Sequence, residues 1–340
     1  MLSYSASYVS PSFAWIIALL GMAYPYWLTS FLFLTILLLL FKKYKIILIN
    51  LLIILLGFND LSSWIQINFT SKHNECKSFR VMSYNVKLFD LYNWRENKKH
   101  QKEMLSLVKE QNPDIISFQE FYYDGIEFFA DSVAKILEMP YYRIVDSRFS
   151  RNVAHFGQAI YSKYPINNYE IIKFPQTTNR SFFCDINLPS NKIVRVFCNH
   201  LESYRFKEED YQLMKDLPKE RKSILQSSGI LKRLKKALVK RSYQAEKVAS
   251  FVNASPYPVI VTGDFNDTPN SYAYHLISRN LQDAFETSGN GFSHTYKGAF
   301  PSFRIDFILY SKALKPINYQ RFKFPHSDHY PICTDFCLNK

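Results

Sequence analysis

Charged residues are absent from the first 41 positions of this 340-residue chain. That absence excludes the segment from the ordinary surface of a soluble domain, where charged side chains are abundant. From Phe13 to Phe41 the sequence is apolar apart from Pro25 and a few small or hydroxyl residues, and Lys42, Lys43 and Lys45 follow. An apolar tract of this length can cross a bilayer core of about 30 Å, with a tilt or with a kink at the proline.

The features of a cleaved signal peptide are also missing. Such a peptide needs a basic residue before its apolar core and small residues at a cleavage site after it, and the chain has neither. We therefore expect residues 1–65 to be a retained membrane anchor with two transmembrane helices. The second apolar run, Ile46 to Phe58, spans only if its ends extend into Tyr44 and residues 61–65. Otherwise this run is an interfacial or core helix.

The lysines between the two apolar runs predict an orientation. Basic loops remain on the cytoplasmic side of a membrane. Two spanning helices therefore place the N-terminus and the rest of the chain outside the cytoplasm, whereas a single span reverses the side. The predicted partner of this segment is the lipid bilayer, and the sequence indicates no obligate protein partner.

Cysteine is scarce, and its spacing excludes the common zinc sites. An odd number of cysteines cannot all pair, and no Cys-x-x-Cys spacing occurs. Cys184 and Cys198 lie in strand-like runs, which favours small apolar core residues over ligands. The cysteines therefore indicate neither a compartment nor a chemistry. The five are Cys76, Cys184, Cys198, Cys333 and Cys337.

The net charge of +13 is concentrated in one segment, from Lys215 to Arg241, which has ten basic and two acidic residues. Such a segment can follow anionic lipid headgroups or nucleic acid phosphates. It is equally compatible with a solvated helix whose apolar stripe packs on the domain, and the two interpretations are not exclusive. The stripe consists of Ile230, Leu231, Leu234 and Leu238.

After a polar linker at residues 66–78, apolar runs that read as strands alternate with helical stretches. This order predicts one α/β domain over residues 79–340 with two packed sheets and a basic insertion at about residues 202–240 beside the active-site mouth. The expected helices are 99–111, 126–137 and 242–252. The expected strands are 80–84, 114–118, 159–161, 182–188, 193–199, 259–262 and 305–310.

Six short motifs place polar residues at or beside the ends of these apolar runs. A carboxylate for a metal, an Asp/Asn pair and an Asp/His pair at strand ends can form one hydrolytic site. The motifs are Ser-Tyr-Asn-Val (83–86), Asp-Ile-Ile-Ser-Phe-Gln-Glu (114–120), Asn-His-Leu (199–201), Gly-Asp-Phe-Asn (263–266), Arg-Ile-Asp-Phe (304–307) and Ser-Asp-His (327–329).

In this order the motifs resemble the endonuclease/exonuclease/phosphatase superfamily, over the range from about Phe79 to Cys337. The resemblance implies a four-layer α/β/β/α sandwich of the deoxyribonuclease-I type. It also implies hydrolysis of phosphoester bonds with Mg²⁺, for which Mn²⁺ is a possible substitute. The chemistry agrees, because an anionic phosphoester with a poor leaving oxygen needs charge neutralisation, a positioned water and a proton donor.

The resemblance assigns metal binding to Glu120, with Asp328 near the metal. Asn85 is expected either to contact the metal or to hold Glu120 and the substrate phosphate. Asp264 orients or deprotonates the attacking water. Asn266 hydrogen-bonds the transition-state phosphate, and alternation along the strand directs it to the same side as Asp264.

The two histidines complete the implied catalytic set. His329 contacts the phosphate, and Asp306 accepts a hydrogen bond from the other ring nitrogen. His200 contacts the substrate and helps to protonate the leaving group. The chain departs from relatives at Lys87, where some carry an Asp, and at Tyr122, where abasic-site endonucleases carry a Lys.

Three hypotheses follow for the function. The leading one is a membrane-anchored Mg²⁺-dependent phosphodiesterase or phosphatase whose catalytic domain is extracytoplasmic. The second is a nuclease that acts on DNA or RNA outside the cytoplasm, and the third is a non-catalytic membrane scaffold. The substrate of the leading hypothesis stays open among a lipid headgroup, a nucleic acid and a small phosphorylated molecule.

Overall fold

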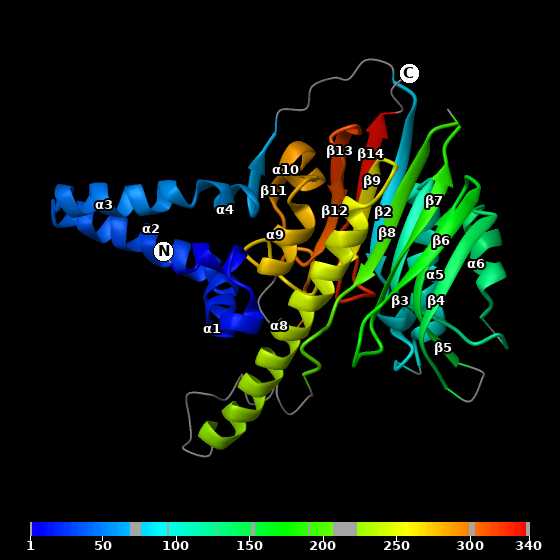
Figure 1. Ribbon diagram of the computed structural model, residues 1–340, viewed down its shortest axis with the longest axis horizontal. Coiled ribbons are helices and arrows are strands. Elements are labelled where there is room, and N and C mark those ends of the chain that lie inside the picture. Colours follow the sequence, from blue (N-terminus) through cyan, green and yellow to red (C-terminus); the bar gives the residue numbers. More distant parts are fainter. Residues whose placement is uncertain are drawn as a thin grey trace.

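The structure is a computed structural model that describes residues 2–68, 76–93, 95–126, 128–150, 154–189, 191–206, 223–298 and 303–337. Within these ranges, an α/β domain carries an apolar helical hairpin that projects away from its sheets (Figure 1). Most of the domain belongs to two packed sheets of six strands each.

The first sheet carries β8 and β9 at its centre as parallel neighbours, and its other pairings are antiparallel. Its inner strands are apolar runs buried on both faces, as expected for a sheet with a layer on each side. The spatial order is β10 (Gln282–Asp283), β12 (Asp306–Tyr310), β9 (Val259–Asp264), β8 (Ile193–His200), β7 (Arg180–Asn187) and β6 (Ile166–Lys173).

The second sheet also has one parallel pair at its centre, formed by β2 and β3. Its spatial order is β13 (Lys315–Arg321), β14 (Ile332–Cys337), β2 (Ser78–Asn85), β3 (Ile115–Tyr123), β5 (Ala154–Ser162) and β4 (Tyr141–Ser150). The core between the sheets contains Phe79, Ile115, Phe182, Val196, Ile260, Ile308 and Phe336, all fully buried.

Helices cover the outer face of each sheet. α5 (Asn97–Gln111) and α6 (Ala130–Leu137) bury Met104, Val108 and Val133 against the second sheet. α8 (Ser223–Asn253) and α9 (Tyr272–Ser278) bury their apolar faces against the first. The described residues therefore form the α/β/β/α layering that the motif resemblance implied. The short elements are η2 (Lys87–Asp90), α10 (Ala284–Ser288) and β11 (Asn290–Phe292).

The N-terminal region begins with η1 (Tyr4–Ser7) and α1 (Pro11–Met22), which pack on α9 and α8, respectively. α2 (Tyr24–Leu40) and α3 (Tyr44–Leu56) then form the projecting hairpin, and α4 (Phe58–Ser62) leads back to the domain (Figure 1). No single described helix has both the length and the apolar composition of a membrane span. The pair of α1 and α2 reaches them together, with a bend of 48° at its break.

The predicted linker at residues 66–78 differs in the structure. β1 (Ile65–Ile67) pairs with β11, so the chain forms a strand on the domain as soon as it leaves α4. Trp64 Nε1 donates to Asn270 Oδ1 at 2.6 Å, and this bond ties the same segment to the domain. Residues 69–75 of the predicted linker lie outside the described residues. The end of the N-terminal region, from Trp64 to Ile67, is therefore held against the domain.

Two predicted helices have different bounds. The helix expected at 126–137 begins only at Ala130, because the preceding residues form a turn in which Asp124 accepts from the backbone N–H groups of Ile126 and Phe128. The helix expected at 242–252 is the last part of α8, which begins at Ser223. The second half of the predicted insertion is thus helical, and residues 207–222 lie outside the described residues.

One disulfide joins Cys76, just before β2, to Cys337 at the end of β14. The other three cysteines are free and buried. Cys184 and Cys198 belong to the core between the sheets, the place expected for small apolar residues.

Candidate active site

Strand ends from both sheets meet at one edge of the sandwich, and they carry the polar motif residues. In the first sheet, Asp264 is the register partner of both His200 on β8 and Asp306 on β12. In the second sheet, Asn85 ends β2 beside β3, which carries Glu120. Sheet register groups these residues within each sheet, and the hydrogen bond between Asn85 and Asp264, which are 179 positions apart, joins the two sheets.

Glu120 lies at an irregularity of β3. The pairing with β5 is interrupted between Phe118 and Phe121, and Glu120 has a left-handed φ of 49°. A non-glycine residue in this region costs about 1–3 kcal/mol, and such conformations cluster at functional sites. The side chain keeps 34 % exposure, so its carboxylate faces open space. Desolvation by the surrounding protein raises the pKa of this carboxyl above its ordinary value.

Asp264 is the centre of the polar network. Its Oδ2 accepts from Asn85 Nδ2 at 3.0 Å, and its Oδ1 accepts from the backbone N–H of Asn266 at 2.7 Å. The Nε2 atoms of His329 and His200 lie 3.7 and 3.8 Å from the same Oδ2. Burial raises the pKa of Asp264, against the opposing effect of His329. A raised pKa suits a carboxylate that must accept a proton near neutral pH.

The surroundings shift the pKa values of the two histidines in opposite directions. Burial disfavours the charged ring of His329, but Asp306 and Asp264 outweigh it and raise its pKa. The contact responsible joins His329 Nδ1 to Asp306 Oδ2 at 2.9 Å. Burial lowers the pKa of His200, and Asp264 compensates only in part. Within the described residues, the buried Nε2 of His200 has no hydrogen-bond partner, and it lies 3.7 Å from Glu120 Oε1.

Asn266 is held by the turn that follows β9. Its φ of 54° is left-handed, and Gly263 before it has φ 131°. A Cβ on Gly263 would lie 2.1 Å from the carbonyl oxygen of Asn199, so this position requires glycine. Arg241 from α8 donates to the carbonyl oxygen of Asn266 and pairs with Asp267 at 3.1 Å. The turn therefore depends on a fully buried guanidinium.

Asn85 contacts Glu120 through a hydrogen bond, whereas Asp328 acts on Glu120 through its charge. Asn85 Nδ2 donates to Glu120 Oε1 at 3.4 Å, while its Oδ1 accepts from the backbone N–H of Lys87 at 3.0 Å. In this orientation Asn85 holds the carboxylates, which is one of its two expected roles. Asp328 raises the pKa of Glu120 through its charge, and its Oδ2 lies 4.0 Å from Lys87 Nζ.

The side chains suit a hard divalent cation, because the acceptors here are carboxylate oxygens. Among the described residues, ligand atoms of Asp264, Asp306 and His329 lie within 4.8 Å of one another. Those three already engage one another. Glu120 has one amide partner and open space before it, so it retains acceptor capacity for a cation. The donor set therefore fits a metal at Glu120 better than at the His329 pair.

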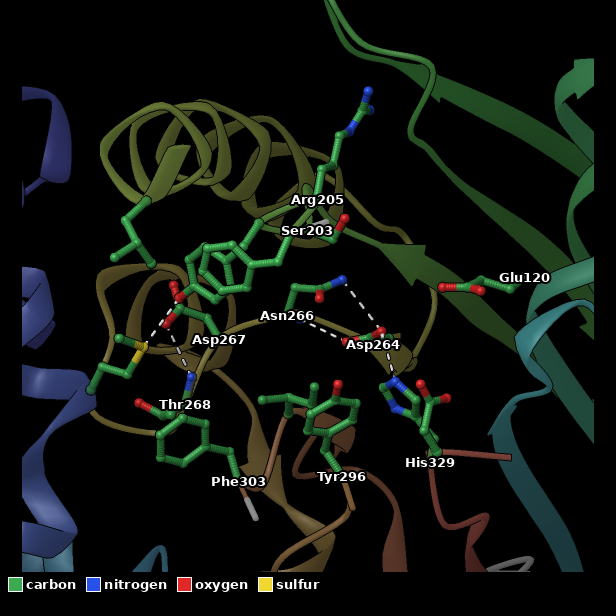
Figure 2. Close-up of a pocket in the computed structure, with 16 residues that line it drawn as sticks. Glu120, Ser203, Arg205, Asp264, Asn266, Asp267, Thr268, Tyr296, Phe303 and His329 are labelled. Carbon is green, nitrogen blue, oxygen red and sulfur yellow. Dashed lines mark hydrogen bonds and ion pairs between the residues drawn. The ribbon is translucent and has the colours of Figure 1, made fainter. Parts of the chain in front are cut away.

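A cavity of about 280 Å³ opens in front of these residues and has two distinct ends. Its polar end consists of Glu120, Asp264, Asn266 and His329. Figure 2 shows Glu120 facing Asp264 and His329 across open space, whereas Phe303 lies on the opposite side and the Arg205 guanidinium points away. Its apolar end is lined mainly by Met22, Tyr204, Phe206, Leu234, Phe303 and Ile305, and Asp267 and Thr268 border the same end.

Several residues of this site carry no motif in the sequence. Tyr296 packs its ring on His329 with 5.0 Å between centroids, and its backbone bridges the same residue. Arg241 stacks on Tyr204, with its Cζ 4.4 Å from the ring centroid. His294 contacts Arg321 at 2.9 Å and does not line the cavity.

The basic segment at 215–241 divides in the structure. Lys215, Lys219, Arg221 and Lys222 lie outside the described residues. On α8, Lys235 and Lys236 are exposed, whereas Arg241 is completely buried, so the interpretation of Arg241 as part of a charged surface is wrong. Of the expected apolar stripe, Ile230 and Leu238 are buried and Leu231 is exposed.

Comparison with known proteins identifies the fold. The sequence model of the endonuclease/exonuclease/phosphatase family matches residues 82–329, and a model of a domain of unknown function matches residues 1–64. A search of curated proteins gave no match.

Solved structures share the fold at low identity. The human Nocturnin catalytic domain with bound sulfate is 18 % identical, with a TM-score of 0.54, and the match covers 76 % of this chain and 93 % of that one. A mannosyl-6-phosphatase from Bacteroides thetaiotaomicron is 15 % identical, with a TM-score of 0.53 and coverage of 77 % and 100 %. An endonuclease/exonuclease/phosphatase from Beutenbergia cavernae is 14 % identical, with a TM-score of 0.53 and coverage of 77 % and 72 %.

Proposed function

The chain belongs to the endonuclease/exonuclease/phosphatase family and is a phosphoester hydrolase, and from this premise we propose a membrane-anchored, Mg²⁺-dependent phosphodiesterase or phosphatase with an extracytoplasmic catalytic domain. The observation that carries the proposal is the convergence of motif side chains from both sheets on one polar network, four members of which, Glu120, Asp264, Asn266 and His329, line the cavity. A non-catalytic scaffold would not need this set. The converging residues are Asn85, Glu120, His200, Asp264, Asn266, Asp306 and His329.

In the proposed chemistry, the role of each residue follows from its expected charge. Asp264, with a raised pKa, accepts the proton of the attacking water. His329 is held as a cation by Asp306, and it stabilises the charge that develops on the phosphoryl oxygens. Asn266 adds a neutral hydrogen-bond donor.

His200 serves the leaving group in this scheme. Burial lowers the pKa of its ring, which favours the neutral form in the free site. An anionic phosphate beside it favours the charged form, so the ring can take up a proton as substrate binds and return it to the departing oxygen. We assign this transfer to the Nε2 atom, which has no hydrogen-bond partner among the described residues.

Glu120 is proposed to hold the cation, with Asn85 orienting its carboxylate and Asp328 nearby. A bound Mg²⁺ supplies neutralisation of the phosphate charge. Lys87 occupies the position at which some relatives carry an acidic residue, so this chain offers fewer carboxylates for a second ion.

Three features support the membrane part of the proposal. The hairpin of α2 and α3 exposes large apolar side chains, including Phe33, Leu40 and Leu48, and an apolar surface of this kind needs a nonaqueous surrounding. Lysines lie at its tip, which suits the cytoplasmic face. The Cys76–Cys337 disulfide suits an oxidising compartment on the other side.

The test uses the full chain, expressed in membranes and purified in detergent. We expect hydrolysis of bis-p-nitrophenyl phosphate that is abolished by EDTA and restored by Mg²⁺. We also expect the chain to stay in the membrane fraction after an alkaline carbonate wash. Metal-independent turnover would contradict the cation, and release of the chain by carbonate would contradict the anchor.

A second function, hydrolysis of DNA or RNA outside the cytoplasm, is favoured by the lysines of α8. Lys232, Lys235, Lys236, Lys240 and Lys247 line a second cavity along this helix. Recruitment of nucleic acid by these lysines predicts that binding weakens steeply as salt rises. A flat dependence of oligonucleotide binding on salt concentration would remove this function.

A further inference from the structure

We infer that the substrate is a phospholipid of the membrane that holds the anchor, with its phosphate at the polar end of the cavity and its hydrocarbon at the apolar end. The inference rests on the proposed function and adds the substrate class to it. It comes from the composition of the apolar end, from the origin of one of its walls, and from the charges around it.

The apolar end lacks a free charge among the described residues. Arg205 lines the cavity, but it pairs with Glu202 at 3.2 Å and its guanidinium points away (Figure 2). Asp267 is neutralised by buried Arg241 at 3.1 Å. A nucleic acid strand continues as phosphates on both sides of the scissile bond, and these would need cations here. A hydrocarbon chain needs none.

One wall of the apolar end belongs to the anchor itself. Met22 is the last residue of α1, immediately before the bend into α2. Tyr204, from the segment after β8, donates to Met22 Sδ at 3.2 Å. The cavity therefore begins where the chain leaves the domain for the apolar hairpin. A lipid can enter along this hairpin, so its acyl chains move from the apolar interior of the bilayer to the apolar end of the cavity.

The outside of this entrance is basic. α1 packs against α8, and Lys235 Nζ lies 6.0 Å from the centroid of the Trp15 ring. Lys236 lies on the same helix and is exposed. Lysines beside an apolar surface attract anionic headgroups. They would concentrate phospholipid at the mouth of the cavity while leaving the apolar end uncharged.

A third cavity, distinct from the one along α8, is lined by Glu120 and His200 and is more polar than the first. Its lining includes Tyr92, Ser147 and Asn179. Since Glu120 borders both cavities, a phosphate bound there has hydrocarbon space on one side and hydroxyl and amide groups on the other. This arrangement matches a phospholipid, which has an apolar and a polar substituent on the same phosphate.

The test measures inhibition of bis-p-nitrophenyl phosphate hydrolysis by methyl, butyl and octyl phosphate, with the full chain in detergent and free inhibitor concentrations determined by dialysis. Each has one phosphate and one tail, and we expect the tail in the apolar end of the cavity. Burial of methylenes predicts that Ki falls with chain length, by up to about fourfold per methylene. Phosphatidylglycerol vesicles should inhibit, whereas glycerophosphoglycerol, which has the same headgroup without chains, should not.

Three variants test whether the apolar end of the cavity causes the dependence of Ki on chain length. Leu234→Asp should remove the dependence of Ki on chain length, and Met22→Ala should reduce it, which covers the case in which the first variant does not fold. Leu231→Asp, on the same helix but exposed and away from the cavity, should keep the wild-type dependence.

A Ki that is independent of chain length, or an oligonucleotide that competes better than the vesicles, would overturn the lipid inference and leave the hydrolase intact. An adequately folded chain that hydrolyses no phosphoester with Mg²⁺ would overturn the proposed function and the inference together.

Discussion

The polar and apolar ends of one cavity are constructed in opposite ways. The polar end and the residues that hold it come from β2, β3, β8, β9 and β12 and from the two loops that carry Asn266 and His329, and its side chains hold one another through bonds such as Asn85 to Asp264 at 3.0 Å. The apolar end comes from α1, the segment after β8, α8 and the turn before β12. None of those segments is a sheet strand. The catalytic side chains are thus positioned by strands and the loops at their ends, whereas the shape of the apolar end depends on segments outside the sheets.

The two ends also differ in which family models cover them. The model of the endonuclease/exonuclease/phosphatase family matches residues 82–329, which hold the strand-borne motifs, whereas Met22 in the wall of the apolar end lies within residues 1–64, which a separate model matches. Variants at the polar end should therefore affect every substrate, and variants at the apolar end should affect only some.

The largest effects are expected at the polar end. His329→Ala removes the cation beside the phosphate, and Asp264→Ala removes the acceptor for the water proton. Each should lower kcat by about 10²- to 10⁴-fold, measured with bis-p-nitrophenyl phosphate. The matched control is His294→Ala, since His294 contacts Arg321 outside the cavity. Equal losses in the control and in His329→Ala would mean that histidine replacement acts through folding.

Arg241 connects the two ends, because it stacks on Tyr204 and holds Asn266 and Asp267. Arg241→Met leaves Asp267 buried without its partner, which should lower the free energy of unfolding by about 3–5 kcal/mol. Chemical denaturation measures this loss. Adding Asp267→Asn should recover part of it, and a double variant as unstable as the sum of the singles would show that the pair is not the cause.

The polar end could be predicted from the sequence. Each of its residues follows or ends an apolar run. Strands that are buried on both faces have such uninterrupted apolar runs, so the runs indicate strands. β9 is an example, since all of its residues from Val259 to Asp264 are buried. Once strands are inferred, sheet geometry brings their ends together, so the motif order carries the site. β6 and β13 were not predicted, since these edge strands are rich in polar residues and lack an apolar run.

The apolar end could not be predicted. Met22 and Tyr204 are 182 positions apart and lie in no motif, and their contact depends on how α1 packs on α8. Arg241 appeared to continue a charged segment, because composition does not distinguish an exposed guanidinium from one that pairs with a buried carboxylate. The buried acceptor, Asp267, appears in the sequence only as part of a turn.

Glu120→Gln tests the cation at the polar end. The substitution removes one negative charge while keeping the shape and the partner Asn85. We expect the Mg²⁺ concentration for half-maximal activity to rise at least about tenfold, because even residues that only orient a ligand change metal affinity by that amount. Glu110→Gln, at an exposed position of α5, is the control. An unchanged Mg²⁺ titration in folded Glu120→Gln would remove this residue from the metal site.

The smallest effect concerns two residues that act as one unit. Asp306 lies 2.9 Å from His329 Nδ1 and raises the pKa of that ring, together with Asp264. Asp306→Asn alone should lower kcat less than His329→Ala, because the ring remains but is held and charged less well. Once His329 is gone, Asp306 has nothing to orient, so Asp306→Asn in the His329→Ala background should change kcat little further. The four variants form a cycle measured under one saturating Mg²⁺ concentration. If the two losses multiplied instead, Asp306 would contribute separately from His329, and the pairing that gives the polar end its cation would have to be abandoned.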